Sequence, residues 1–118
     1  MSILMSNTAA AMDKTKLSSA DRKLLQQYAQ ETHADYCAGC TAICESAIKG
    51  DFPIGNVMRY LMYSRSYGEH DHACKRFRNI EPRIRRQIPE LDYSLAEIRC
   101  PQKMPIGRLM KEAAEKLS

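Results

Sequence analysis

Apolar residues recur at helical spacing in several stretches of this 118-residue chain, and short polar or glycine-containing segments separate the stretches. The first stretch covers about residues 19–31. Ser18 followed by Asp21 is typical of the capping box that begins a helix. Nearby apolar positions lie three or four residues apart, the spacing of one helix face: Leu17, Ala20, Leu24, Leu25 and Tyr28. The pattern predicts a helix with one apolar face.

Three longer helices are predicted downstream. One ends at Gly68, another covers the charged stretch 69–79, and the last begins at Pro105, because proline suits the first helical turn. Pro82 and Pro89 divide the intervening region into short turns or helices. The residues expected to face the core are Val57, Met58, Leu61 and Met62, then Ala73, Cys74 and Phe77, then Ile106, Leu109, Met110, Ala113, Ala114 and Leu117. No stretch alternates with period two, so we predict an all-α fold, a small bundle of about five helices.

Residues 1–16 are small and polar, and we expect them to form a flexible N-terminal lead-in to one helical domain at residues 17–118. Hydrophobic residues make up 44% of the chain and charged residues 27%, which is ordinary for a globular protein. No apolar run approaches the roughly 18–20 residues that span a bilayer. The start of the chain also lacks the pattern of a secretory signal. We therefore expect a cytoplasmic protein without a membrane partner.

The net charge of +4 is moderate but unevenly spread, with six basic residues against three acidic ones between residues 69 and 86. This distribution is typical of a solvated surface. No nucleic-acid-binding module is recognisable, so no nucleic-acid partner is expected. The sequence also contains no serine–histidine–aspartate arrangement and no phosphate-binding glycine loop. We predict no catalytic residue in this chain.

The five cysteines are the most informative feature, because three of them lie within eight residues as Cys37-x2-Cys40-x3-Cys44. In a chain without an export signal, this crowding favours metal binding over disulfides. Bacterial ferredoxins use the spacing Cys-x2-Cys-x2-Cys-x3-Cys-Pro, in which the last cysteine binds the other cluster of a pair. Cys100, which precedes Pro101, matches the last position of a second such motif.

A short internal repeat accompanies the cysteines. Residues 52–58 read FPIGNVM and residues 104–110 read MPIGRLM; each segment follows a cysteine and opens an amphipathic helix. We interpret the repeat as a duplication in which Cys44 and Cys100 occupy the equivalent last positions, with loops that differ in length by four residues. The crossover of the last cysteine then brings Cys37, Cys40 and Cys100 to one site and leaves Cys44 in a second site, whose cluster is lost.

The predicted metal ligands are therefore Cys37, Cys40, Cys44 and Cys100, for at most one 4Fe–4S cluster. The fourth ligand beside Cys37, Cys40 and Cys100 is left open between Cys44 itself, Cys74 and His33. Zn is an alternative, because it accepts four thiolates or three thiolates and an imidazole. A chain that has lost its metal is the other alternative.

Residues 59–68, RYLMYSRSYG, resemble the RYxMYxxxYG segment of the C-terminal, helical ferredoxin-like domain of iron–sulfur aldo/keto reductases. The pattern Tyr36-Cys37-x2-Cys40 is also similar to that family, and the resemblance extends over roughly residues 17–117. It implies an α-helical ferredoxin-like fold, an iron–sulfur cluster, and a (β/α)8 barrel as a partner in cis or in trans. The barrel and its Asp-Tyr-Lys-His catalytic set lie outside this chain.

The expected function is an accessory iron–sulfur, electron-transfer module of an aldo/keto reductase-type oxidoreductase, encoded separately or as part of a longer chain. A redox partner protein would exchange electrons with it. The alternatives are a cluster-free module that packs on a reductase barrel and a small Zn-binding helical protein.

Overall fold

The computed structural model of the chain describes residues 2–32 and 36–118, and over these residues it contains helices and no strand, which confirms the all-α prediction. The described part has eight α-helices and one 3-10 helix, more than the five expected. The difference comes from short helices such as α3, α6 and α7, which have five or six residues. So few residues cannot display a periodic apolar stripe.

The chain divides into two compact units, one ending at Glu31 and the other starting at Thr32. The first unit contains α1 (Ser2–Met12) and nearly all of α2 (Ser19–Thr32). A helix thus stands where the sequence analysis expected a flexible lead-in, because the alanine-rich segment before Met12 favours helix strongly. The compact helical domain begins at Thr32, later than the expected residue 17.

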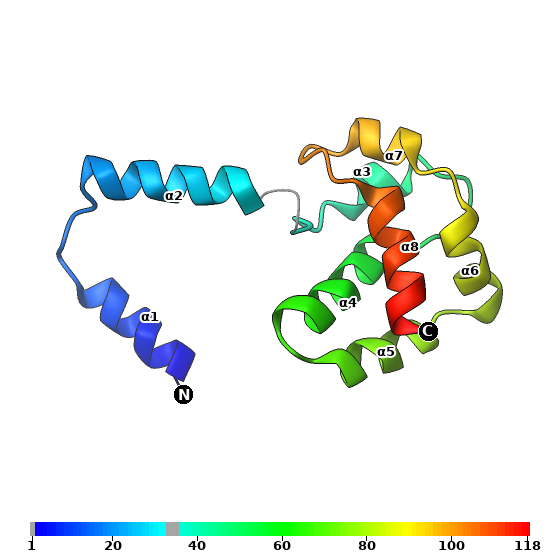
Figure 1. Cartoon of the computed structure of the whole chain (residues 1–118), viewed down its shortest axis with the longest axis horizontal. Helices are drawn as coiled ribbons and strands as arrows, with labels where there is room; N and C mark the ends of the chain where they lie inside the picture. Colours follow the sequence, from blue (N-terminus) through cyan, green and yellow to red (C-terminus); the bar gives the residue numbers. More distant parts are fainter. Residues whose placement is uncertain (1, 33–35) are drawn as a thin grey trace. The chain divides into compact units, whose positions relative to one another are not determined.

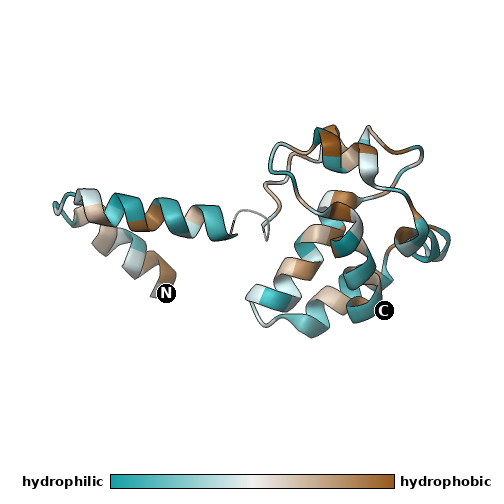
Figure 2. Cartoon of the chain, turned by 45° about the horizontal axis from the view of Figure 1, so that its top comes forward, coloured by the Kyte–Doolittle hydropathy of each residue, from teal (hydrophilic) through white to brown (hydrophobic). Residues whose placement is uncertain are grey.

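The predicted capping box at the start of α2 is present. The Ser18 N–H donates to Asp21 Oδ2 at 2.9 Å, and the Asp21 N–H donates to Ser18 Oγ at 3.1 Å. The side chain of each residue thereby accepts a hydrogen bond from the backbone N–H of the other. Most of the α2 ribbon has the colour of hydrophilic residues in Figure 2. None of the described side chains of α2 is buried, so its apolar residues are accessible to solvent.

The second unit contains α3 (Thr41–Glu45), α4 (Ile54–Ser66), α5 (His70–Arg78), α6 (Pro82–Gln87), the 3-10 helix η1 (Ile88–Glu90), α7 (Ser94–Arg99) and α8 (Ile106–Leu117). Helix α4 packs against α5 and α8, α8 also packs against η1, and α3 packs against α7 (Figure 1). The three longer helices match the three predicted downstream of residue 50.

The core of the second unit forms where α4, α5, α8 and η1 meet. Val57, Phe77, Ile88 and Met110 are fully inaccessible to solvent, and each comes from a different one of these helices. Ala73 and Cys74 are buried on α5, as predicted. Apolar burial of this kind stabilises a helical bundle by roughly 25 cal/mol per Å². It also gives α4 and α8 fixed positions, from which they support the segments that carry the cysteines.

Candidate metal centre

The loops that enter α4 and α8 end in the same backbone conformation. The residue before each helix is a proline, Pro53 with φ −81° and ψ 67° and Pro105 with φ −76° and ψ 70°. In both loops the isoleucine after the proline donates its N–H to the carbonyl of the residue that precedes the proline. Ile54 donates to Phe52 and Ile106 donates to Met104, both at 2.9 Å. The predicted sequence repeat is therefore also a repeat of local structure.

A carboxylate supports each repeat in the same way. Glu45 Oε1 accepts a hydrogen bond from the Gly55 N–H at 3.1 Å, and Glu97 Oε1 accepts one from the Gly107 N–H at 2.8 Å. Both bonds join residues ten positions apart. Each ties the short helix of its half to the first turn of the long helix, where the backbone N–H groups lack helical partners. Helices α3 and α4 thus form one half, and α7 and α8 form the other.

This geometry corrects the alignment that the cysteines suggested. In the structural register, each residue of the first half pairs with the residue fifty-two positions later, as Glu45 pairs with Glu97. Cys44 is then equivalent to Ala96, and Cys100 is equivalent to Ile48. Equating Cys44 with Cys100 was wrong because it assumed loops of unequal length, whereas the carboxylate-to-amide bonds hold both loops to one length.

In the corrected register, the second half supplies the last, crossing cysteine of a ferredoxin motif, and the first half supplies three further cysteines. Cys44 matches the third position of the motif, whereas Cys37 and Cys40 each lie one residue before the first and second positions. Cys37 and Cys40 precede α3, and Cys44 lies within it. Cys100 ends α7 and is followed by Pro101, as the ferredoxin pattern requires. The last position of the first half is Ile48, which cannot bind metal.

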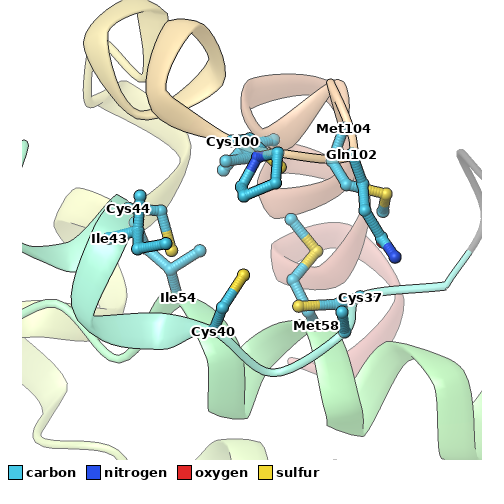
Figure 3. Close-up of a pocket in the computed structure, with 12 residues that line it drawn as sticks. Cys37, Cys40, Ile43, Cys44, Ile54, Met58, Cys100, Gln102 and Met104 are labelled. Atoms are coloured by element: carbon cyan, nitrogen blue, oxygen red, sulfur yellow. The ribbon is translucent and has the colours of Figure 1, made fainter.

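All four of these cysteines line one pocket of the second unit. Figure 3 shows Cys37 and Cys40 on the loop before α3, Cys44 beside them, and Cys100 on the opposite side of the same central space. The expectation that Cys44 would lie apart, in a second site, does not match this arrangement. The sequence-predicted ligands are thus brought together from both halves of the repeat.

The pocket is apolar apart from its thiols and one amide. Ile54, Met58 and Met104 are buried residues of its wall. The side chains leave about 390 Å³ free of atoms, part of it open to solvent, but the cavity proper is about 20 Å³. A cavity of that size admits one water-sized sphere. A larger group would require the thiols and the flexible methionine side chains to turn outward.

Burial differs among the thiols. Cys44 and Cys100 are buried, Cys37 is half-buried and Cys40 is exposed. Burial raises the pKa of the Cys44 thiol, and the nearby Glu45 carboxylate and Cys37 raise it further. Apolar surroundings and like charges disfavour a lone thiolate. A positively charged metal centre would supply the compensating charge, because metal ligation keeps a cysteine deprotonated.

Gln102 is a wall residue that the sequence did not indicate. Its Oε1 atom is buried and has no hydrogen-bond partner in the structure. Gln102 therefore brings an unpartnered polar group to the otherwise apolar wall beside the thiols.

The donor geometry differs between a single ion and a cluster. Among residues 2–32 and 36–118, no three histidine, cysteine, aspartate or glutamate side chains are arranged to hold one metal ion. Four thiolates on one Zn at 2.3 Å would lie about 3.8 Å from one another. In a cluster each thiolate binds a separate iron, so the sulfurs lie further apart around an inorganic core. As they stand, the four cysteines line one pocket without forming either arrangement.

Of the other two candidate ligands, the structure describes only Cys74. His33 lies outside the described residues. Cys74 is buried on α5, where its sulfur is 3.4 Å from His70 Nε2, and it does not line the cysteine pocket. Of the two candidates that the structure describes, Cys44 and Cys74, Cys44 is the one on the pocket wall.

The equivalent region of the second half is filled by side chains. Tyr93 replaces Thr41 and is buried, and its hydroxyl donates to the Ile88 carbonyl at 2.8 Å. Ala96, which replaces Cys44, is fully buried. The second half therefore supplies core packing at the positions that Thr41 and Cys44 occupy in the first half.

Comparison with known proteins adds no assignment. No family model matches the chain, and neither a curated protein nor a solved structure is significantly similar to it. Over the described residues, no helix combines the length and the apolar character needed to cross a bilayer.

Proposed function

We propose that this protein binds one 4Fe–4S cluster through Cys37, Cys40, Cys44 and Cys100 and serves as a one-electron carrier for an oxidoreductase. The observation that supports the proposal is the convergence of these four cysteines, from both halves of a duplicated fold, on one apolar pocket. Four cysteine thiolates are the usual ligand set of such a cluster. When bound, the cluster would supply reversible one-electron chemistry.

The four cysteines would bind the cluster, and other residues of the pocket would shield it from water. Ile54, Met58 and Met104 would exclude water from the inner side of the cluster. Cys40 is exposed, so the edge of the cluster beside it would lie near the surface and accept or release electrons there. Solvent exposure and hydrogen bonds to sulfur would together set the reduction potential.

The proposed partner is a reductase barrel of the aldo/keto type, in cis or in trans, with a redox partner protein to exchange electrons. This part rests on the resemblance of residues 59–68 to the reductase domain and on the chain's lack of a catalytic set of its own. The proposed setting is the cytoplasm, where free cysteines persist. All five cysteines of the chain are free in the structure.

The test is anaerobic reconstitution of the full chain with iron and sulfide, followed by iron, sulfide and Zn analysis and by visible spectroscopy. The expected result is a brown protein with about four irons and four sulfides per chain. Cys44→Ala and Cys100→Ala should each lower the iron content by more than half. Cys74→Ala is the matched control, because it removes a buried cysteine outside the pocket, and it should leave the iron content unchanged.

Two outcomes would contradict the proposal, and each would indicate a different function. Stoichiometric Zn without acid-labile sulfide would indicate a Zn-binding helical protein. A folded, colourless and metal-free chain after reconstitution would indicate a packing module without a cluster, and co-purification of a barrel subunit would then identify its role. Circular dichroism of each variant would separate loss of metal from loss of fold.

A further inference from the structure

A second group of reactive side chains lies outside the cysteine pocket, where α4 turns into α5. Gly68 has a φ of +70°, a conformation that glycine adopts without strain. The turn closes with a hydrogen bond from the Glu69 N–H to the Tyr63 carbonyl at 3.0 Å. As a result, His70 at the start of α5 lies beside Ser64 in the last turns of α4.

The three side chains form a chain of contacts. His70 Nδ1 is 2.8 Å from Ser64 Oγ, and His70 Nε2 is 3.4 Å from Cys74 Sγ. When the proton of the imidazole is on Nδ1, it donates to Ser64, and Nε2 is left to accept from the thiol. A nucleophile, a base and a third group that orients the base are the parts of an activated cysteine.

Cys74 is mostly buried, with 8% of its surface exposed. It lies on the wall of a surface hollow with two basic side chains and one acidic side chain beside the histidine. The residues that line this hollow are His70, Asp71, Cys74, Lys75, Arg78 and Asn79. A small anionic molecule would therefore meet a net positive charge next to the thiol.

We propose that Cys74, with His70 as its base and Ser64 as the residue that orients His70, is a modification site that undergoes thiol–disulfide exchange with small anionic disulfides. The site is independent of the proposed cluster, because it shares none of its ligands. Histidine and cysteine four residues apart on one helix face are the sequence signal for it.

The exchange step is balanced without a further oxidant. The proton of Cys74 passes to His70 Nε2, and the thiolate sulfur attacks one sulfur of the disulfide. A new S–S bond forms at Cys74 as the bond of the small disulfide breaks. The electron pair of that bond goes to the leaving thiolate, which takes the proton back from His70. One disulfide is consumed and one mixed disulfide is formed.

The first test measures the rate at which oxidised glutathione modifies Cys74 in the full, reduced chain, by mass spectrometry of the peptide that contains Cys74. His70→Gln should lower this rate about tenfold, since an unassisted thiol is only a few per cent thiolate at pH 7. His72→Gln is the matched control. His72 lies on the same helix but contacts the Tyr63 ring, 5.9 Å away between centroids, and its loss should change the rate less than about twofold.

An unchanged rate in His70→Gln, or equal losses in the two histidine variants, would overturn the proposed role of His70. Ser64→Ala gives a second variant in case His70→Gln does not fold, and it should lower the rate by a smaller factor. A wild-type rate no faster than that of the urea-unfolded chain would show that the folded site does not activate the thiol.

The second test addresses the anionic specificity. Lys75→Gln should slow the reaction with oxidised glutathione and leave the reaction with the neutral 2-hydroxyethyl disulfide unchanged. Equal effects on both disulfides, or no effect on either, would contradict the proposed preference for anions.

Discussion

The two halves of the second unit share a backbone plan but differ in what their side chains place at its centre. Both halves join a short helix to a long one through a Pro-Ile-Gly turn and a carboxylate that accepts a hydrogen bond from the glycine. The first half carries three cysteines, whereas the second half carries none at the equivalent positions and has the buried Tyr93 where the first half has Thr41. The same backbone arrangement therefore accommodates different side chains at its centre.

Alanine substitution of Tyr93 and of its counterpart Thr41 should give the largest difference in unfolding free energy between the halves. Tyr93→Ala removes a buried ring and leaves a cavity, and we expect the free energy of unfolding to fall by about 3–5 kcal/mol. Its counterpart change, Thr41→Ala in the first half, should cost about 1 kcal/mol or less. Urea unfolding followed by circular dichroism measures both. Similar losses in the two variants would contradict the idea that only the second half is filled by core packing.

The two glycines should respond in opposite directions to the same substitution. A Cβ at Gly55 would overlap the γ-methyl of Thr41, so Gly55→Ala should destabilise the fold by about 1–3 kcal/mol. A Cβ at Gly107 would lie 3.5 Å from its nearest neighbour, Glu97 Oε1. Gly107→Ala should therefore be neutral or stabilising by up to about 1 kcal/mol, because alanine favours helix.

Thermal and urea unfolding of the two alanine variants would measure this contrast. Thr41→Ser removes the methyl group that obstructs position 55, so it should recover most of the loss caused by Gly55→Ala. A loss that persists in the double variant would show that the backbone, and not the Thr41 methyl, restricts this position.

The paired carboxylates should behave alike. Glu45→Ala and Glu97→Ala each remove the acceptor for a backbone N–H at the start of a long helix, and each should cost about 1 kcal/mol, as capping substitutions do. The exposed Glu115 on α8 is the control, and Glu115→Ala should stay within about 0.5 kcal/mol of the wild type. A loss in only one half, measured by urea unfolding, would mean that the repeated turn is supported differently in the two halves.

The smallest effect is expected at the ion pair between the long helices. Glu112 on α8 pairs with Arg65 on α4 and with Lys116. The hydrogen bond from Arg65 holds the pKa of the Glu112 carboxyl below its ordinary value of 4.5. Glu112→Gln should cost up to about 1 kcal/mol at neutral pH, in the range of partly exposed pairs.

The sign of the pH effect follows from that lowered pKa. The pair stabilises the fold above the pKa that Glu112 has in the unfolded chain, and the contribution is lost as the pH falls through the lower, folded pKa. Urea unfolding at pH 7 and pH 3 should therefore show a larger difference between wild type and Glu112→Gln at pH 7. A difference that does not shrink at pH 3 would show that the contact acts through packing.

Local sequence patterns predicted most of the fold. The capping box of Ser18 and Asp21, the stop at Gly68 and the proline before α8 each depend on neighbouring residues, and the structure shows all three features. The short helices and the extent of the compact domain were not predicted. These depend on which apolar faces find partners, and a linear pattern does not contain that information.

At the candidate site, the contribution of the sequence differs from that of the tertiary structure. The sequence by itself determined that the chain is helical, that it contains a repeated Pro-Ile-Gly turn, and that Cys37, Cys40, Cys44 and Cys100 are its metal-ligand candidates. Only the tertiary structure decided the register of the repeat and the common pocket of the four cysteines. The reason is that the register depends on hydrogen bonds that Glu45 and Glu97 accept from the helices that follow them, and these bonds form only when the helices are packed.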